Sequence, residues 1–164
     1  MIRDALLSDA SAMVNIYNHY VSNTAITFEE TRVSDAEFKS RISKVQQAGL
    51  PWLLATGDQG VLGYAYATPW KERSAYRYSV ESTVYLAEQA QGRGLGTALY
   101  QALLERLGRL DINSVIGGIT LPNPASVALH EKVGMKKVAH FEQVGFKFNT
   151  WLDVGYWQLN LSPE

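Results

Sequence analysis

The residues most suggestive of chemistry are three closely spaced glycines, Gly92, Gly94 and Gly96, which run directly into a leucine-striped helical pattern. A loop that leads from a strand into a helix presents unpaired backbone amides and the positive end of the helix dipole. Because glycine has no Cβ atom, such a loop can wrap closely around an anion. The run predicts a pyrophosphate-binding loop with Arg93 as an added cation. A flexible loop with a glycine-assisted helix start is the alternative.

Two common phosphate-binding loops do not fit this run. The loop of nucleoside-triphosphate-binding proteins ends in lysine followed by serine or threonine, whereas this run ends Gly-Thr-Ala. The dinucleotide fingerprint has the spacing G-x-G-x-x-G near the start of a parallel-sheet unit, and here the loop lies past the middle of the chain. A third kind of phosphate carrier is therefore expected.

Length and composition predict one domain over residues 1–164 of a cytoplasmic protein. The formal charge of −1 gives no broad basic footprint for a nucleic acid, and no run approaches the roughly 20 apolar residues of a membrane span. The opening MIRDALLSDA has no signal-peptide core. Cysteine is absent and the three histidines are dispersed, so we expect no metal site.

The elements that position the loop follow from hydrophobic periodicity and turn signals. Helices are expected from an N-cap at Ser8, from a capping box at Ser34 to a stop at Gly49, over 95–107 and over 123–133. Strands are expected at 2–5, 51–56, 61–67, 78–86, 114–120, 136–148 and 151–161. The order β-α-α-β-β-β-α-β-α-β-β predicts a mixed α/β domain with one central sheet.

Two spaced motifs resemble those of the GCN5-related N-acetyltransferases, the GNAT family. The pattern Q-x-x-G-x-G from Gln91 resembles the family's coenzyme A loop, and NPASVALHEKVGM from Asn123 resembles its N-x-x-S-x-x-L-[YH]-E-x-x-G-[FM] helix. The stretches NHYVSNTAITF, PWKERSAYRYSVESTVYL and FKFNTWLDVGYWQ resemble the phosphinothricin acetyltransferase branch. This similarity covers the chain from Ile2 to about Leu161.

The resemblance implies a fold, a coenzyme and a reaction. The fold would be a central, mixed and largely antiparallel sheet of about seven strands, flanked by helices and splayed where acetyl-CoA binds. Members of this branch acetylate the α-amino group of phosphinothricin, methionine sulfoximine and methionine sulfone. The residues implied to bind acetyl-CoA are Val84, Leu86, Gln91, Gly92, Arg93, Gly94, Gly96, Thr97, Asn123 and Ser126; for Ser126 a helix-cap role is the alternative.

Acetyl transfer to an amine needs a base, because an ammonium ion has no lone pair for the attack. Glu81 is a carboxylate inside the otherwise apolar strand SVESTV, where burial would raise its pKa toward the working pH. The matching glutamate is the proposed base in this branch, often through water. The alternative for Glu81 is an outward-facing residue on a half-solvated sheet. His130 is the second catalytic candidate, at a position where many relatives carry a tyrosine that protonates the thiolate; a packed helix histidine is its alternative.

The substrate side is implied by resemblance alone for most positions. A zwitterionic amino acid needs a cation for its carboxylate, and arginine can pair with one through two hydrogen bonds. Arg73 leads the group for this reason. The residues implied to bind the substrate are Phe28, Arg73, Tyr76, Thr83, Tyr85, Lys147 and Val154.

Three questions stay open at the level of sequence. Gly117 and Gly118 are unusual inside a strand, and either a close approach of backbone or ligand, or a β-bulge, would explain them. A homodimer is implied by resemblance, with Trp151 and Trp157 as either interface or core residues. The substrate could instead be a peptide N-terminus, a polyamine or an aminoglycoside, or the domain could bind acetyl-CoA without turnover.

Overall fold

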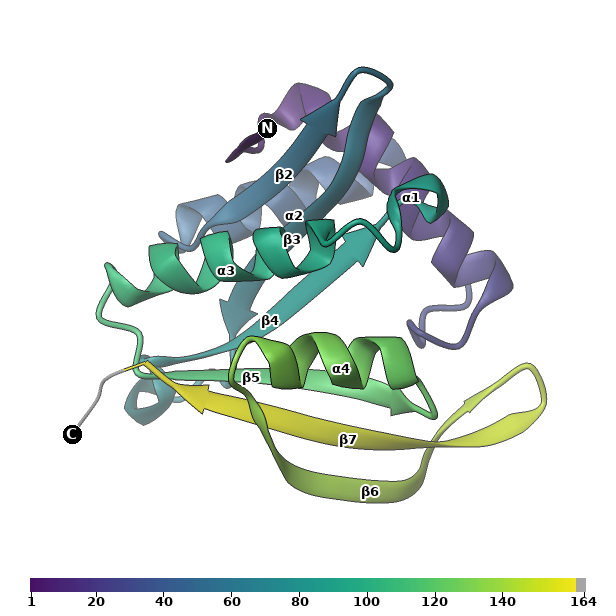
Figure 1. The fold of residues 1–164 in the computed structure, drawn as a ribbon, viewed down its shortest axis with the longest axis vertical. Coiled ribbons are helices and arrows are strands. Elements are labelled where there is room, and N and C mark those ends of the chain that lie inside the picture. The colour runs from purple at the N-terminus through teal and green to yellow at the C-terminus, as the bar shows by residue number, and fades with distance from the viewer. Residues whose placement is uncertain (162–164) are drawn as a thin grey trace.

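A computed structural model of the chain describes residues 1–161. Seven strands form one sheet in the order β1-β2-β3-β4-β5-β7-β6 (Figure 1). All neighbouring strands are antiparallel except β4 and β5, which are parallel. The strands are β1 (Ile2–Asp4), β2 (Trp52–Gly57), β3 (Gly60–Pro69), β4 (Ser79–Leu86), β5 (Ser114–Leu121), β6 (Lys136–Lys147) and β7 (Thr150–Asn160). The expected mixed, largely antiparallel sheet is confirmed.

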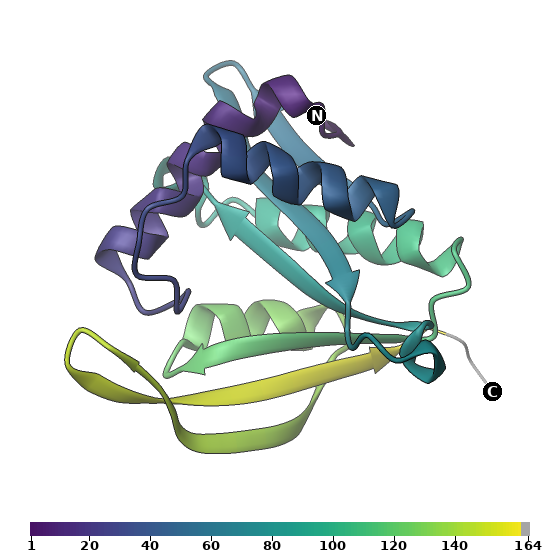
Figure 2. The same cartoon turned by 180° about the vertical axis from the view of Figure 1, so that it is seen from behind.

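The four α-helices cover both faces of this sheet. Helices α3 (Leu95–Gly108) and α4 (Pro124–Lys132) lie on the face seen in Figure 1, and α1 (Ala10–Asn23) and α2 (Asp35–Gln47) lie on the face seen in Figure 2. Each face has its own core: leucines of α3 pack on one, and Trp52, Tyr64 and Phe38 pack with α1 on the other. Within residues 1–161 no helix has the length and apolar character needed to cross a bilayer.

The expected order of elements is correct, and the differences lie at helix starts. Ser8 is not an N-cap, because a 3-10 turn over Leu7–Asp9 precedes α1, and the Asp9 carboxylate instead binds Arg3 and the Leu6 amide. Ser34 does cap α2 through the Glu37 amide at 3.0 Å. The Glu37 carboxylate binds Arg41 instead, so only half of the expected capping box forms. A left-handed Gly49, with φ of 76°, follows the end of α2 as expected.

The feature that positions the site is a fork between β4 and β5. Their parallel pairing covers only three residue pairs and ends at Glu81 and Ile116, while β5 stays paired with β7 as far as Leu121. The carbonyl of Ser79 accepts a hydrogen bond from the amide of Trp70, the residue after β3. The odd-numbered backbone groups of β4 therefore face β3, and the even-numbered ones face the fork. Beyond Glu81, the backbone of Val84 therefore faces a gap. The expected splay is confirmed.

Candidate active site

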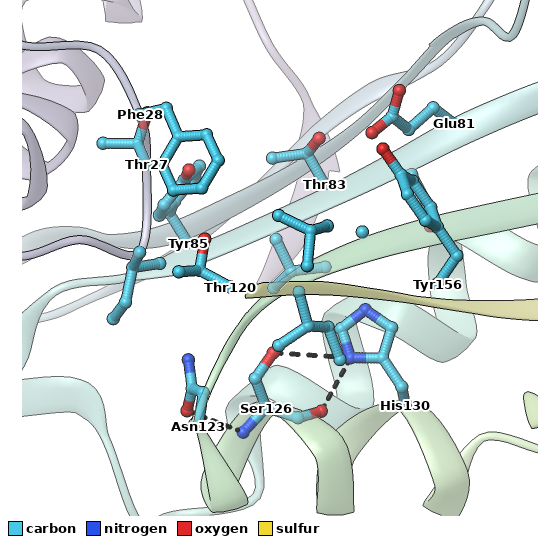
Figure 3. Close-up of a pocket in the computed structure, with 16 residues that line it drawn as sticks. Thr27, Phe28, Glu81, Thr83, Tyr85, Thr120, Asn123, Ser126, His130 and Tyr156 are labelled. Carbon is cyan, nitrogen blue, oxygen red and sulfur yellow. Dashed lines mark hydrogen bonds between the residues drawn. The ribbon is translucent and has the colours of Figure 1, made fainter. Parts of the chain in front are cut away.

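A pocket occupies the fork (Figure 3). Its walls come from β4, β5 and β7, from the first turns of α4 and from the loop after α1. The lining residues are Ile26, Thr27, Phe28, Glu81, Ser82, Thr83, Val84, Tyr85, Gly118, Ile119, Thr120, Asn123, Ser126, His130, Val154 and Tyr156.

The pocket opens to both faces of the sheet because side chains alternate along β4. Val84 packs with the α3 core, whereas Tyr85 packs with the aromatic core under α1. Glu81 and Tyr85 are four residues apart on β4, so the Glu81 side chain also points to the α1 face. His130 reaches the pocket from α4 on the opposite face. The pocket is therefore lined by a carboxylate from one face of the sheet and by an imidazole from the other.

Glu81 is a half-buried carboxylate that lacks a protein donor. None of the hydrogen bonds found among residues 1–161 reaches it, and burial raises its pKa, with Lys71 opposing this through its positive charge. A carboxylate without donors keeps its basicity, since hydrogen bonds to the charged form would lower its pKa. The site thus contains a group suited to accept a proton near neutral pH.

His130 is buried, and burial lowers its pKa, so the ring is neutral at neutral pH. Its Nδ1 lies 2.7 Å from the Ser126 carbonyl oxygen, which can only accept. The proton therefore sits on Nδ1, and Nε2 carries a lone pair. This nitrogen can accept a hydrogen bond or a proton, but in this state it cannot donate one.

The two strand glycines make room for side chains of the site. A Cβ atom at Gly117 would lie 2.8 Å from His130 Nε2, and one at Gly118 would lie 3.1 Å from Tyr156 Cε1. The register between β5 and β7 runs without a shift through both positions, so the β-bulge alternative is wrong. The close approach is real, but it is made by the protein's own side chains.

The glycine loop contains two glycines in the left-handed conformation and leads directly into α3. Gly92 and Gly94 have φ of 78° and 77°, and Gly94 is the N-cap of α3 with no side chain over the amides. A Cβ at Gly96 would meet only ordinary contacts at 3.4 Å or more, from Leu129 and Leu86. The exposed Arg93 lies beside the loop. These open amides next to the fork fit a pyrophosphate and its attached arm.

Other residues that are expected to bind the coenzyme form hydrogen bonds with their neighbours in the fold. The Tyr20 hydroxyl donates to the Leu86 carbonyl and accepts from Gln91 Nε2 at 3.1 Å, which fixes the loop against α1. Asn123 is the N-cap of α4 and accepts from the Ser126 amide at 3.2 Å, so the capping role belongs to Asn123. Thr97 lies in the first turn of α3.

The substrate candidates divide into two groups. Phe28, Thr83, Tyr85 and Val154 line the pocket. Three others do not: Arg73 and Tyr76 are exposed on a 3-10 turn before β4, and Lys147 is buried with its amino group donating to the Thr27 carbonyl at 2.8 Å. Within residues 1–161, no lysine or arginine lines this pocket.

Sequence reasoning missed Tyr156, Thr27 and Tyr100. Tyr156 lies within the motif FKFNTWLDVGYWQ, but its place at the site follows from the β5–β7 register, in which it pairs with Gly118. Tyr100 binds the Ser82 hydroxyl behind His130. Nothing in the sequence signals that contact. Among the described residues there is no group of three or more histidines or carboxylates that could hold a metal.

Comparison with known proteins shows the family. A model described as an acetyltransferase (GNAT) domain matches residues 2–155. The chain belongs to the GNAT acetyltransferase family.

Its relatives include two groups of named enzymes. This GNAT chain is 39% identical to a phosphinothricin N-acetyltransferase of Streptomyces viridochromogenes, over 96% of this chain and 85% of the relative. It is 37% identical to an L-methionine sulfoximine/L-methionine sulfone acetyltransferase of Pseudomonas aeruginosa, over 99% of this chain and 95% of the relative. The expectation that the chain is an N-acetyltransferase is confirmed.

A solved GNAT structure shows the same architecture. The phosphinothricin acetyltransferase of Sinorhizobium meliloti in complex with acetyl-CoA superimposes with a TM-score of 0.96 at 37% identity, covering 99% of this chain and 88% of the other. The expected fold is confirmed, and acetyl-CoA is the cosubstrate of this GNAT enzyme.

The close packing of His130 against Gly117 predicts that a side chain at position 117 would destabilise the protein. Gly117→Ala should lower the free energy of unfolding of this acetyltransferase by about 1–3 kcal/mol, because the added methyl group overpacks against His130. Gly117→Ala combined with His130→Ala should lose less than the sum of the single variants. Urea denaturation measures both quantities.

Gly108→Ala is the matched control, since a Cβ at this position in α3 meets no atom within 4 Å. It should leave stability unchanged or raise it by up to about 1 kcal/mol. Equal losses of unfolding free energy in Gly117→Ala and Gly108→Ala would contradict the claim that His130 packs into the space beside Gly117.

Proposed function

We propose that this enzyme, as a single domain over residues 1–164, acetylates the α-amino group of small amino-acid analogues such as phosphinothricin, methionine sulfoximine and methionine sulfone. The observation that carries this is a pocket through the β4–β5 fork with one carboxylate, Glu81, on the face opposite α4. The names of the relatives above support the substrate class.

Glu81 is the general base in this proposal. Its role is to take the proton of the substrate ammonium, directly or through a water molecule, so that the nitrogen lone pair becomes free. Acetyl-CoA supplies the acetyl group as a thioester. Because the pKa of Glu81 is raised, activity should fall as the pH drops through that value and the carboxylate becomes protonated.

In this proposal His130 assists the acetyl transfer from the α4 face of the sheet. Its Nε2 lone pair can orient a water molecule or the incoming nucleophile by accepting a hydrogen bond, with the ring held by the Ser126 carbonyl. In its neutral form it is not the proton donor for the leaving thiolate. Tyr85 is a poor acid for that step because burial raises its pKa far above neutrality.

The coenzyme side uses backbone groups more than side chains. The amides of the glycine loop and the positive end of α3 suit the pyrophosphate, with Arg93 as an added cation. The fork-facing backbone of Val84 suits the amide groups of the pantetheine arm, as an added strand would. Asn123 and Ser126 border the same space.

Polycationic substrates are the less favoured alternative. Glu81 is the one acidic residue among those that line the described pocket. Glu131 accepts from the Trp157 indole at 3.1 Å, and Asp153 binds His140 at 2.8 Å. A polyamine or an aminoglycoside would want several free carboxylates, whereas a small amino acid needs only one near its amine.

A homodimer is part of the proposal. Strand β6 is a sheet edge of 12 residues, and long apolar edges invite a partner strand. Large apolar side chains along the β6–β7 hairpin are 48–61% exposed: Val138, Phe141, Val144, Phe146, Phe148 and Trp151. Trp157 instead is buried in the core. A second copy of this chain is the occupant that we propose for this hairpin.

The first test is a panel of amines assayed by thiol release from acetyl-CoA. We expect turnover of phosphinothricin, methionine sulfoximine and methionine sulfone, and little with a polyamine, an aminoglycoside or a short peptide. Glu81→Gln should lower kcat about 10²–10⁴-fold, because an amide cannot take up the proton. It should also remove the acid limb of the pH profile.

Glu105→Gln is the matched control, because this glutamate is exposed on α3, outside the pocket lining, and pairs with Arg109. It should keep wild-type rates. Full activity in Glu81→Gln would reject the base while leaving the family assignment in place. If no amine of the panel causes thiol release although acetyl-CoA still binds, the substrate class is rejected. The chain would then be a coenzyme-binding module or would act on an untested amine.

Light scattering after size exclusion tests the dimer. The wild type should have twice the 18.2 kDa chain mass, and Trp151→Glu should shift it toward the single chain by placing a charge in the apolar contact. Leu110→Glu, which alters a 44% exposed leucine outside the hairpin, should stay dimeric. A wild type of single-chain mass at micromolar concentration would contradict the homodimer.

A further inference from the structure

Tyr156 lies against the proposed base across Gly118. A Cβ atom at Gly118 would be 3.1 Å from Tyr156 Cε1 and 3.6 Å from Glu81 Oε2. The ring and the carboxylate therefore border the same small volume above β5, and Figure 3 shows the Tyr156 hydroxyl directed toward the Glu81 carboxylate. Glycine at position 118 leaves this volume free, whereas a Cβ atom there would lie tightly against the Tyr156 ring.

The Tyr156 ring is held in this place by two other rings. Trp70 meets it edge-on at 5.8 Å between centroids, and Phe141 does so at 5.9 Å from β6. Backbone pairing of Tyr156 with Gly118 in β5 and with Ala139 in β6 fixes the strand beneath it. The ring thus has little freedom to leave the carboxylate.

We propose that Tyr156 is a positioning residue whose ring shields the Glu81 carboxylate from bulk water, in a notch that Gly118 provides. This inference rests on the proposed role of Glu81 as the base. Desolvation by a ring held in place disfavours the carboxylate ion, and this raises the pKa of Glu81 and makes the group a stronger base.

Several titratable groups besides Tyr156 lie on the elements around Glu81. Lys71, in the loop after β3, lowers the pKa of Glu81 and so opposes the effect of burial. Besides burial, the negative charge of Glu81 raises the pKa values of Tyr66 on β3 and Tyr100 on α3. Their phenols stay protonated at neutral pH because burial raises each pKa. His130, across the fork, is neutral. The positive charge of Lys71 lowers the pKa of Glu81, so its effect is opposite to that of shielding by the Tyr156 ring.

The test is a carbon NMR titration of the Glu81 carboxyl group in the unliganded protein, whose signal is identified by its loss in Glu81→Gln. Tyr156→Val should move the midpoint to lower pH, because water reaches the carboxylate. Tyr156→Phe keeps the ring and should leave the midpoint in place. The acid limb of kcat/KM should move in the same direction in Tyr156→Val, with KM for acetyl-CoA unchanged.

An unchanged midpoint in folded Tyr156→Val would overturn the proposal. So would a change in Tyr156→Phe as large as that in Tyr156→Val, because the hydroxyl rather than the ring would then be responsible. Tyr156→Thr replaces Tyr156→Val if the latter does not fold. Because the titration needs no turnover, its result is separate from the substrate panel and from the activity of Glu81→Gln.

Discussion

The contacts at the fork determine the geometry of this enzyme. Pairing between β4 and β5 ends at Glu81 and Ile116, and the next residues along the two strands are Ser82 and Gly117. The Tyr100 hydroxyl binds Ser82 from α3, and His130 from α4 packs against Gly117. Both contacts lie on the α3 and α4 face of the sheet, directly beyond the last paired residues of the two strands. Backbone groups of β4 beyond this point have no partner strand in β5, so a ligand that enters the cleft can pair with them.

A pocket through a sheet also separates two chemical environments. On the α1 face the Glu81 carboxylate has no protein donor, and burial raises its pKa. On the α4 face the His130 ring is neutral, carries a lone pair on Nε2 and packs against Gly117. Proton acceptance on one face and coenzyme binding on the other would let amine and thioester meet in the gap, which turns a reaction between two molecules into an internal one.

Much of this arrangement was predictable from local patterns. The glycine loop, the order of elements and the carboxylate inside β4 all leave signals in neighbouring residues, because loop chemistry and strand alternation are local properties. The position of Arg73 outside the pocket and the burial of Lys147 were not predictable, since each depends on how distant segments pack. The roles of Gly117 and Gly118 were ambiguous for the same reason: only the packed structure shows that His130 and Tyr156 occupy the missing side chains' space.

The central claim is that the fork-facing backbone of β4 receives the coenzyme, and amide hydrogen exchange followed by NMR tests it most directly. The amides of Thr83 and Tyr85 face β3 and should exchange slowly with or without acetyl-CoA. The Val84 amide faces the gap and should exchange fast alone and slowly once acetyl-CoA is added. Protection of all three amides without coenzyme, or no change at Val84 on saturation with acetyl-CoA, would contradict the account.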